Sequence, residues 1–405
     1  MNLDHIAETY VKLVLAVGEH DESYVDAYIG PAAWRDDAKT QAVSLNALLA
    51  QADALIAHSK SLPPAPQDQT ERHVFLGLQI AAVRAHIAFL NGTVLPFDEE
   101  SKVLYDAVSP TLTPADLDKT LAELDGLLPG EGDLNQRLSH YNKQFEIPRD
   151  KLDAVFSAAI NEARARTRRY IALPDNESFS VEYVSGKVWS AYNWYKGNSH
   201  SLIEVNTDFP MFISRAIDLA SHEAYPGHHV FNVLIENELV KEKGWIEYAI
   251  YPLYSPMSFL AEGSANYGIE VAFPHAERMA FEKEVLFPLA GIDPEKAERY
   301  YQIQAVLQRL SYAGNMVAKR YLDGEIDRET AINMLMTYSL SDAERSAQRI
   351  RFIEKLRSYV INYNLGQDVV QAYIEQRAGT QDQDKRWAVL TDLLRQPKSA
   401  SMMLT

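Results

Sequence analysis

The sequence has no cysteine among its 405 residues. This absence excludes disulfide bonds, thiolate metal ligands and a cysteine nucleophile, so a metal site must use histidine or carboxylate ligands. Positive charge is also scarce, because 39 Lys and Arg residues face 56 Asp and Glu residues and leave a net charge of −17. Binding to nucleic acid needs a basic surface. We therefore expect no nucleic acid partner.

Long apolar runs are missing as well. No run reaches the roughly 18 residues that a membrane span requires, and the N-terminal stretch carries Asp4 and Glu8 where a secretion signal would be basic. These features predict a cytoplasmic protein without a membrane partner. The remaining composition, 47% hydrophobic and 23% charged, is that of an ordinary globular chain.

Helical periodicity dominates what is present. The run from Leu3 to Gly18 has apolar residues at helical spacing and ends at a glycine. Thr113 precedes Pro114 as an N-cap precedes the first turn of a helix. Asp150 to Leu173 is a further helical run. The first 175 residues therefore predict a set of helices.

A strand pattern interrupts the helices between Ser178 and Asn206. Phe179, Val181 and Tyr183 alternate there with polar residues, and glycines mark the turns. We interpret this segment as one small antiparallel sheet. No other segment of the chain has a convincing strand pattern.

The fold class is thus predicted as mainly α with one small antiparallel sheet next to a metal-binding helix. The length favours two or three domains, and we divide the chain into two lobes. Residues 1–175 form an N-terminal helical lobe. Residues 176–405 form a catalytic lobe, with the sheet at 176–206 followed by the C-terminal helices.

A histidine cluster lies between two helical runs, in the segment Ser-His-Glu-Ala-Tyr-Pro-Gly-His-His at residues 221–229. Common zinc helices place the second histidine four residues after the first, but Pro226 holds that position here. On a straight helix His228 would leave the face of His222, and His229 would lie roughly 10 Å along the axis. Pro226 and Gly227 therefore predict a broken or expanded turn that returns a second histidine to His222.

The expected cofactor is one zinc ion held by two histidines and a carboxylate. His222 is the first ligand. For the second, the Gly-His pair favours His228 over His229. Glu262, which has small and apolar neighbours, is the first candidate for the third ligand, and Glu270 is the alternative.

Glu223 follows the first histidine directly, where it can act as the general base toward a metal-activated water. A developing oxyanion would need a further donor. Tyr359 and Tyr363 are the candidates we name for this role, and Tyr267 and Tyr312 remain alternatives.

The string His-Glu-Ala-Tyr-Pro-Gly-His-His at 222–229, followed by Glu-Gly-Ser-Ala-Asn-Tyr at 262–267, resembles the bacterial family catalogued as domain of unknown function 885. That family is grouped by its motif with zinc metallopeptidases whose third ligand is glutamate. The resemblance implies a helical metallopeptidase-like fold with His222, His228 and Glu262 on zinc and Glu223 catalytic. Residues 264–265 are Ser-Ala where many members of that family have Trp-Ala. This difference bears on what the resemblance implies about substrate binding, more than on the metal ligands.

The predicted function is therefore a zinc-dependent metallopeptidase that hydrolyses peptide bonds, with a peptide or another small amide as its substrate. Two alternatives stay open. The protein could be a metal-dependent hydrolase of a non-peptide amide or ester. It could also be a non-catalytic binding protein with a vestigial metal site.

Overall fold

The computed structural model describes residues 2–63, 69–187 and 189–405. The fold is mainly α with small β-sheets, as predicted. The helices before the central sheet are α1 (Leu3–Gly18), α2 (Ala32–Gln41), α3 (Leu45–Ser61), α4 (Thr70–Leu90), α5 (Phe97–Tyr105), α6 (Pro114–Leu127), α7 (Leu134–Asn142) and α8 (Leu152–Arg168).

More helices follow the sheet, and one π-helical segment among them, η4, belongs to the site. These elements are α9 (Ile213–Leu219), the π-helix η4 (Ala220–Ala224), α10 (His228–Leu234), the π-helix η5 (Ile235–Glu242), α11 (Pro256–Ala272), α12 (His275–Phe281), α13 (Phe287–Ala290), α14 (Ala297–Gln308), α15 (Ala313–Leu322), α16 (Arg328–Tyr338), α17 (Ala343–Leu356), α18 (Ile361–Ala378), α19 (Gln383–Arg395) and α20 (Ala400–Met403).

Local sequence explains where several of these helices begin and end. Asn2 caps α1 by accepting a hydrogen bond from the His5 amide, and α1 ends at Gly18 as predicted. Thr113 and Asp116 form a reciprocal capping box at the start of α6, with a proline in the first turn. The predicted helix at 150–173 is shorter in the structure, because α8 ends at Arg168.

The central sheet has three strands, β2 (Ser178–Val184), β3 (Ala191–Gly197) and β4 (His200–Asn206), in the order β2-β4-β3. β3 and β4 form an antiparallel hairpin. β2 pairs with β4 in parallel, with Ser178 opposite His200. The expectation of a wholly antiparallel sheet is therefore wrong, because β4 inserts between two strands that precede it in the chain.

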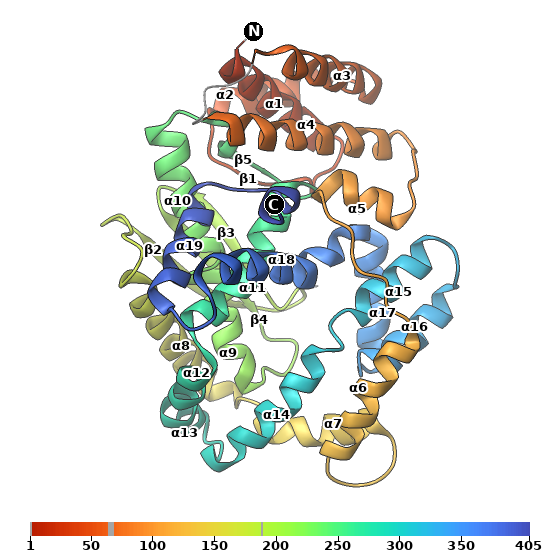
Figure 1. Ribbon diagram of the computed structural model, residues 1–405, viewed down its shortest axis with the longest axis vertical. Helices are drawn as coiled ribbons and strands as arrows, with labels where there is room; N and C mark the ends of the chain where they lie inside the picture. Colours follow the sequence, from red (N-terminus) through yellow and green to blue (C-terminus); the bar gives the residue numbers. More distant parts are fainter. Residues whose placement is uncertain (1, 64–68, 188) are drawn as a thin grey trace.

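A second sheet was not predicted. β1 (Val25–Tyr28) pairs antiparallel with β5 (Ile250–Pro252), so that Tyr28 lies opposite Ile250. These strands are too short to show an alternating pattern, and their pairing joins distant parts of the sequence. Figure 1 shows them side by side beneath the N-terminal helices. The division at residue 175 stays a prediction.

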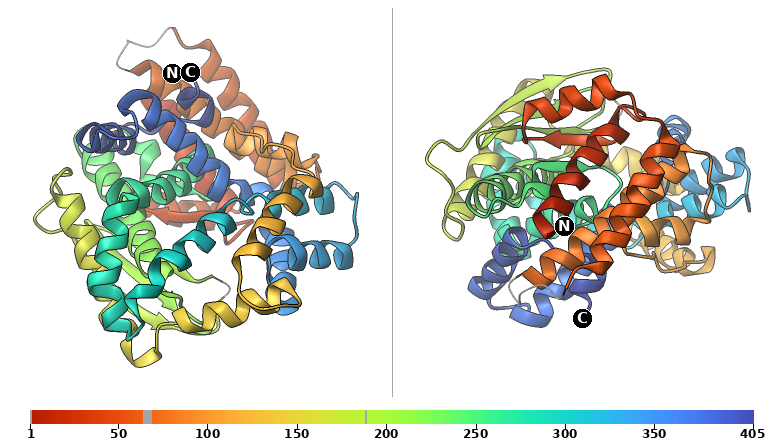
Figure 2. Two further views of the ribbon diagram at one scale, coloured as in Figure 1. Left: turned by 60° about the horizontal axis from the view of Figure 1, so that its bottom comes forward. Right: turned by 90° about the horizontal axis from the view of Figure 1, so that it is seen from above.

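Helices α1 to α4 form a layer over one end of the molecule, seen from above in Figure 2. One of them, α4, is the one helix in the described ranges that is long and apolar enough to cross a membrane. Of its apolar window, 56% is buried inside the fold. Arg72 near its start donates to Glu247 at 2.6 Å. These are the contacts of a core helix.

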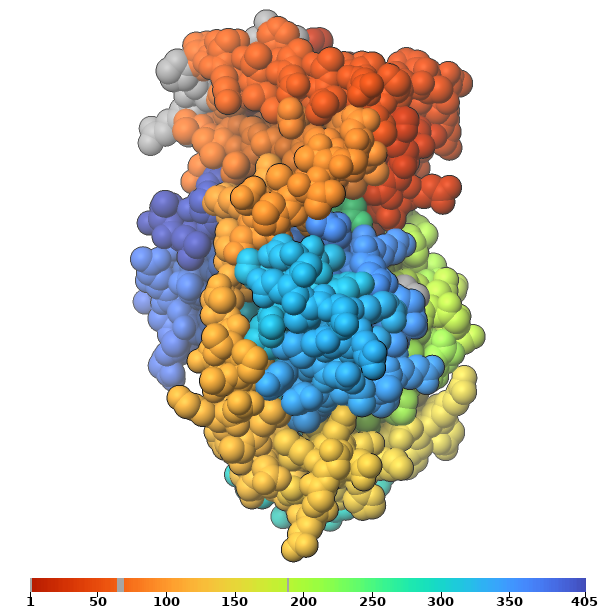
Figure 3. Space-filling model, turned by 90° about the vertical axis from the view of Figure 1, so that its right-hand side faces the viewer, coloured from red at the N-terminus to blue at the C-terminus, as the bar shows by residue number. Residues whose placement is uncertain are grey.

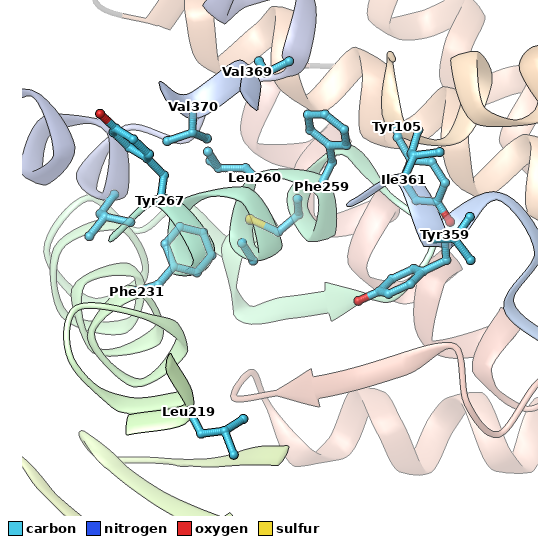
Figure 4. Close-up of a cluster of buried hydrophobic side chains, with 14 of the residues drawn as sticks. Tyr105, Leu219, Phe231, Phe259, Leu260, Tyr267, Tyr359, Ile361, Val369 and Val370 are labelled. Carbon is cyan, nitrogen blue, oxygen red and sulfur yellow. The ribbon is translucent and has the colours of Figure 1, made fainter. Parts of the chain in front are cut away.

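The centre of the molecule is the crossing of α11 and α18. Val369 and Val370 of α18 lie over Phe259 and Leu260 of α11, as Figure 4 shows, and all four are buried. A Cβ atom at Gly263 would lie 2.4 Å from the carbonyl oxygen of Gly366, so glycine is required for this approach. Gly263, the small residue beside Glu262, therefore seats α11 on α18.

Helices α15 to α17 lie together at the right of the view in Figure 1, with α6 and α7 below them. The space-filling view shows the surface of α15 to α17 framed by the N-terminal helices above and by α6 and α7 below (Figure 3). This side of the molecule and the sheet side flank the site described next.

Candidate metal centre

The helix that carries the histidine cluster is broken where the sequence predicts it. α9 widens into the π-helix η4, in which the Tyr225 amide donates to the Ala220 carbonyl. Tyr225 then adopts an extended conformation, and a new helix, α10, begins at His228. The predicted abnormal turn at 225–227 is confirmed.

Gly227 allows the backbone to turn back toward His222. Its amide donates to the Ser221 carbonyl at 2.9 Å. A Cβ atom at this position would lie 1.9 Å from the carbonyl oxygen of His222. The backbone thus folds tightly against the turn that carries the first histidine, and no side chain can fit between them.

The break brings two histidines together. The Nε2 atoms of His222 and His228 are 3.0 Å apart, and their rings stand nearly perpendicular. Burial and the neighbouring His222 lower the pKa of His228 to about 4. His228 is therefore neutral at ordinary pH, with a ring nitrogen free to act as a metal ligand.

Glu262 of α11 completes the cluster. Its Oε2 lies 3.3 Å from Nε2 of His222, and its Oε1 lies 3.8 Å from Nε2 of His228. One donor atom from each residue falls within 4.8 Å of the others. Oε2 is buried and has no hydrogen-bond partner among the described residues.

These separations fit a zinc ion. Ligands at about 2.0–2.2 Å in a tetrahedral arrangement lie roughly 3.4 Å from one another, and the observed separations of 3.0, 3.3 and 3.8 Å bracket that value. Two imidazoles and one carboxylate are also a donor set that zinc prefers. The residues present therefore fit the predicted ion.

Asn266 orients the first histidine and was missed in the sequence. Its Oδ1 lies 2.9 Å from Nδ1 of His222, and its Nδ2 donates to the Tyr363 carbonyl at 2.8 Å. With Nδ1 engaged, Nε2 of His222 points into the cluster. The position was open to prediction, because it lies four residues after Glu262 on the same helix face.

His229 lies outside the cluster. Its ring is fully buried, with Nδ1 2.8 Å from the Ser201 hydroxyl and Nε2 2.9 Å from the Glu177 carboxylate. Tyr225 also donates to Glu177. Glu177 thus ties both sides of the turn to the segment before β2, and His229 has a positioning role.

Burial alone would raise the pKa of Glu177. Hydrogen bonds from His229, Tyr225, Arg164 and Arg168 outweigh burial and hold the pKa well below its usual range. Glu177 is therefore a charged anchor for the turn. The sequence gives no spacing that would connect it to the histidines.

Glu223 is buried beside the cluster and only 5% exposed. Burial raises its pKa to about 7, and the charge of His222 opposes the rise. Asn193 of β3 donates to the Glu223 carbonyl at 2.6 Å and fixes the backbone against the sheet. A carboxyl with a pKa near neutrality suits a group that accepts and returns a proton.

Two of the four candidate tyrosines lie at the cluster. The Tyr359 hydroxyl donates to Oε1 of Glu262 at 2.9 Å, and Figure 4 shows its ring reaching below α11. The Tyr363 ring centroid is 5.7 Å from that of Tyr359. Tyr267 instead donates to Glu375, and Tyr312 donates to Asp368.

The other candidate carboxylate, Glu270, lies outside the cluster and accepts a hydrogen bond from Gln367 at 2.9 Å. A third carboxylate near the site, Asp26 on β1, was missed. It accepts a hydrogen bond from Tyr192 of β3. Burial raises the pKa of Asp26 to about 6, and the charge of Glu262 adds to this rise.

Comparisons with known proteins show the fold alone. No protein-family model matches the chain, and no curated protein matches it significantly. A "putative lipoprotein" from Colwellia psychrerythraea matches with a TM-score of 0.50 and 14% identity, over 97% of this chain and 76% of that chain. Another "putative lipoprotein", of unknown function and from Shewanella oneidensis, matches with a TM-score of 0.51 and 13% identity, over 91% and 75%.

Proposed function

We propose that the protein is a zinc-dependent metallopeptidase. The observation that supports this proposal is the convergence of His222, His228 and Glu262, whose donor atoms lie within 4.8 Å of one another. Glu223, buried next to the first histidine, supplies the one further group that hydrolysis needs.

The residues of the chain have distinct roles in this proposal. His222, His228 and Glu262 hold one zinc ion, which when bound lowers the pKa of its water to about 7. Asn266 fixes the ring of His222 through Nδ1. Tyr359 fixes the carboxylate of Glu262 through its hydroxyl.

Glu223 handles the proton. Its carboxylate accepts a proton from the attacking water and returns it to the nitrogen of the leaving amine, so the peptide bond ends as an acid and an amine. Burial, which brings its pKa to about 7, makes both transfers feasible near neutral pH. Tyr363, whose pKa is raised first by burial and then by the charge of Glu262, stays protonated and can donate to the carbonyl oxygen of the substrate.

The test combines metal analysis with turnover of peptides. We expect one zinc per wild-type chain and cleavage within a peptide library. Glu223→Gln should retain zinc but lower kcat by about 10²- to 10⁴-fold. Glu182→Gln, an exposed position on β2, serves as the matched control and should retain full activity.

Two results would contradict the proposal. Wild-type protein without stoichiometric zinc would contradict the metal site. Equal turnover by Glu223→Gln would contradict the role of Glu223 as the general base. Cleavage of small esters with none of peptides would instead support the non-peptide hydrolase.

The cytoplasmic location stays a prediction. The two similar structures carry the name "putative lipoprotein", which favours a location at a membrane as the alternative. Fractionation of cells that express the full gene, with immunodetection in the soluble and membrane fractions, tests the prediction directly.

A further inference from the structure

A cavity of about 480 Å³ opens between α7, α14, α15 and α17. Its walls combine four leucines with two arginines and several small polar residues. The polar residues that the argument uses are Asn142, Arg345 and Arg349. None of these residues has a role in the metal centre.

Arg349 on α17 has no carboxylate partner among the residues that the structure describes. Its guanidinium lies over the Phe352 ring, 4.6 Å from the centroid. Among the other largely buried arginines, Arg72 pairs with Glu247 and Arg278 pairs with Asp218. Arg386 instead donates hydrogen bonds to Tyr267 and Gln383. In a chain with a net charge of −17, an unpaired arginine at a cavity is unusual, because a desolvated cation gains from an anion.

Arg345, one turn earlier on α17, adds a second positive charge to the same wall. Its nearest carboxylate is Asp342, at 3.9 Å, which is long for an ion pair. The cavity therefore carries more positive charge than the neighbouring carboxylates neutralise.

An acceptor without a partner lies in the same cavity. Oδ1 of Asn142 is buried and makes no hydrogen bond within the described part of the chain. Buried acceptors of this kind are rare in folded proteins. The cavity thus offers cationic donors from α17 and an amide from α7, which together match the carboxylate and the backbone N–H of a peptide.

A row of rings connects this cavity with the metal centre. Phe352 lies 6.4 Å from Tyr363 between centroids, and Tyr363 lies 5.7 Å from Tyr359. Tyr359 donates to Glu262. The cavity is therefore linked to the metal centre through packed side chains.

We propose that this cavity binds the carboxylate end of a short peptide, with Arg349 as the residue that recognises the carboxylate. The proposal rests on the proposed peptidase function and names its substrate class, a peptide with a free carboxylate next to an apolar residue. The leucines of the wall receive the apolar side chain, and Asn142 accepts the peptide N–H. Burial lowers the pKa of Arg349, which marks its charge as poorly solvated.

The test measures binding without turnover. Full-length Glu223→Gln protein is titrated calorimetrically with Ala-Ala-Ala-Leu and with the same peptide as a C-terminal amide. We expect the acid to bind about 10- to 100-fold more tightly, as a charge-assisted hydrogen bond provides. Arg349→Gln should abolish this preference, and Arg349→Lys should keep part of it.

Arg351→Gln is the matched control, because Arg351 lies exposed on the same helix and its loss changes the net charge equally. This variant should keep the full preference. A third peptide, Ala-Ala-Glu-amide, distinguishes the source of the carboxylate. If it binds as tightly as the free acid, the cavity recognises an acidic side chain, and the assignment of a C-terminal carboxylate is overturned.

Equal binding of the acid and the amide, or no binding of either, would overturn the proposal. A preference that survives in Arg349→Gln protein with an unchanged melting temperature would overturn it as well. The titration requires neither zinc nor hydrolysis. It therefore stays readable if the zinc analysis fails, and the two proposals can fail separately.

Discussion

The two helical segments that supply the candidate metal ligands are built in opposite ways. α11 is unbroken, and it presents Glu262 and Asn266 to the site from positions four residues apart. The segment from α9 to α10 is broken, and it brings together His222 and His228 from positions six residues apart. A regular helix aligns only the first spacing, so the second needs a local distortion that the sequence encodes with proline and glycine.

The largest effect is expected from a substitution at Gly227, in the tight turn between the two histidines. In Gly227→Ala the new Cβ atom meets the His222 carbonyl oxygen, 1.9 Å away in the present backbone. The turn must open, and His228 must move away from His222. We expect zinc content to fall from one per chain to near zero, measured by elemental analysis.

Gly126→Ala is the control for this change. Gly126 lies exposed on α6 with nothing within 4 Å of the added Cβ atom. Alanine there should keep zinc and stabilise the helix by up to about 1 kcal/mol. Full zinc content in Gly227→Ala would show that the tight turn is dispensable.

The straight helix should respond in a different way. Gly263→Ala places a methyl group 2.4 Å from the Gly366 carbonyl oxygen and pushes α11 away from α18. We expect a loss of about 1–3 kcal/mol in the free energy of unfolding, measured with denaturant. Gly227 thus acts mainly on the position of the metal ligands, and Gly263 acts mainly on the packing of the core. An unchanged stability would contradict this distinction.

A smaller effect is expected from Asn266→Ala, which frees Nδ1 of His222 without touching a ligand. Loss of such an orienting partner lowers metal affinity by about 10- to 100-fold. Competition with a chelator measures the change. Asn266→Asp, which keeps an acceptor for Nδ1, should recover most of the affinity, and equal affinities in all three proteins would argue against an orienting role.

The smallest effect is expected on the stability of the fold at acidic pH. Because the pKa of Glu177 is held low in the folded protein, its charge stabilises the fold above the ordinary glutamate pKa of about 4.3, and this contribution declines as the pH falls further. Wild-type stability should therefore fall toward that of Glu177→Gln below about pH 4.3, by at most about 1.4 kcal/mol per pH unit. Parallel stability curves from pH 3 to 7 would contradict the assignment.

The parts of the site that sequence could predict are those encoded by local spacing. The segment 221–229 contains the proline and glycine that break the helix. His222 and His228 could therefore be predicted as the two histidine ligands, with His229 as the less favoured alternative. The proximity of Glu262 was inferred from its small neighbours, although Gly263 in fact contacts α18. Chemistry along one segment was thus easier to predict than packing between segments.

The parts that escaped prediction depend on long-range pairing. Nothing near Glu177 or Asp26 connects them to the histidines, because Glu177 reaches His229 from the segment before β2 and Asp26 reaches Tyr192 from another strand. The parallel pairing of β2 with β4 was missed for the same reason. Alternation of apolar and polar residues predicts strands, but it does not predict which strands pair with each other.

The pairing of β1 with β5 has a consequence for the order of folding. β5 lies between the histidine segment and α11, and its partner comes from the first thirty residues of the chain. Contacts of such long sequence separation close late, after the entropy of a long loop has been lost. During synthesis the N-terminal strand must therefore wait until most of the chain has emerged. The metal centre is consequently expected to be among the last regions to become ordered.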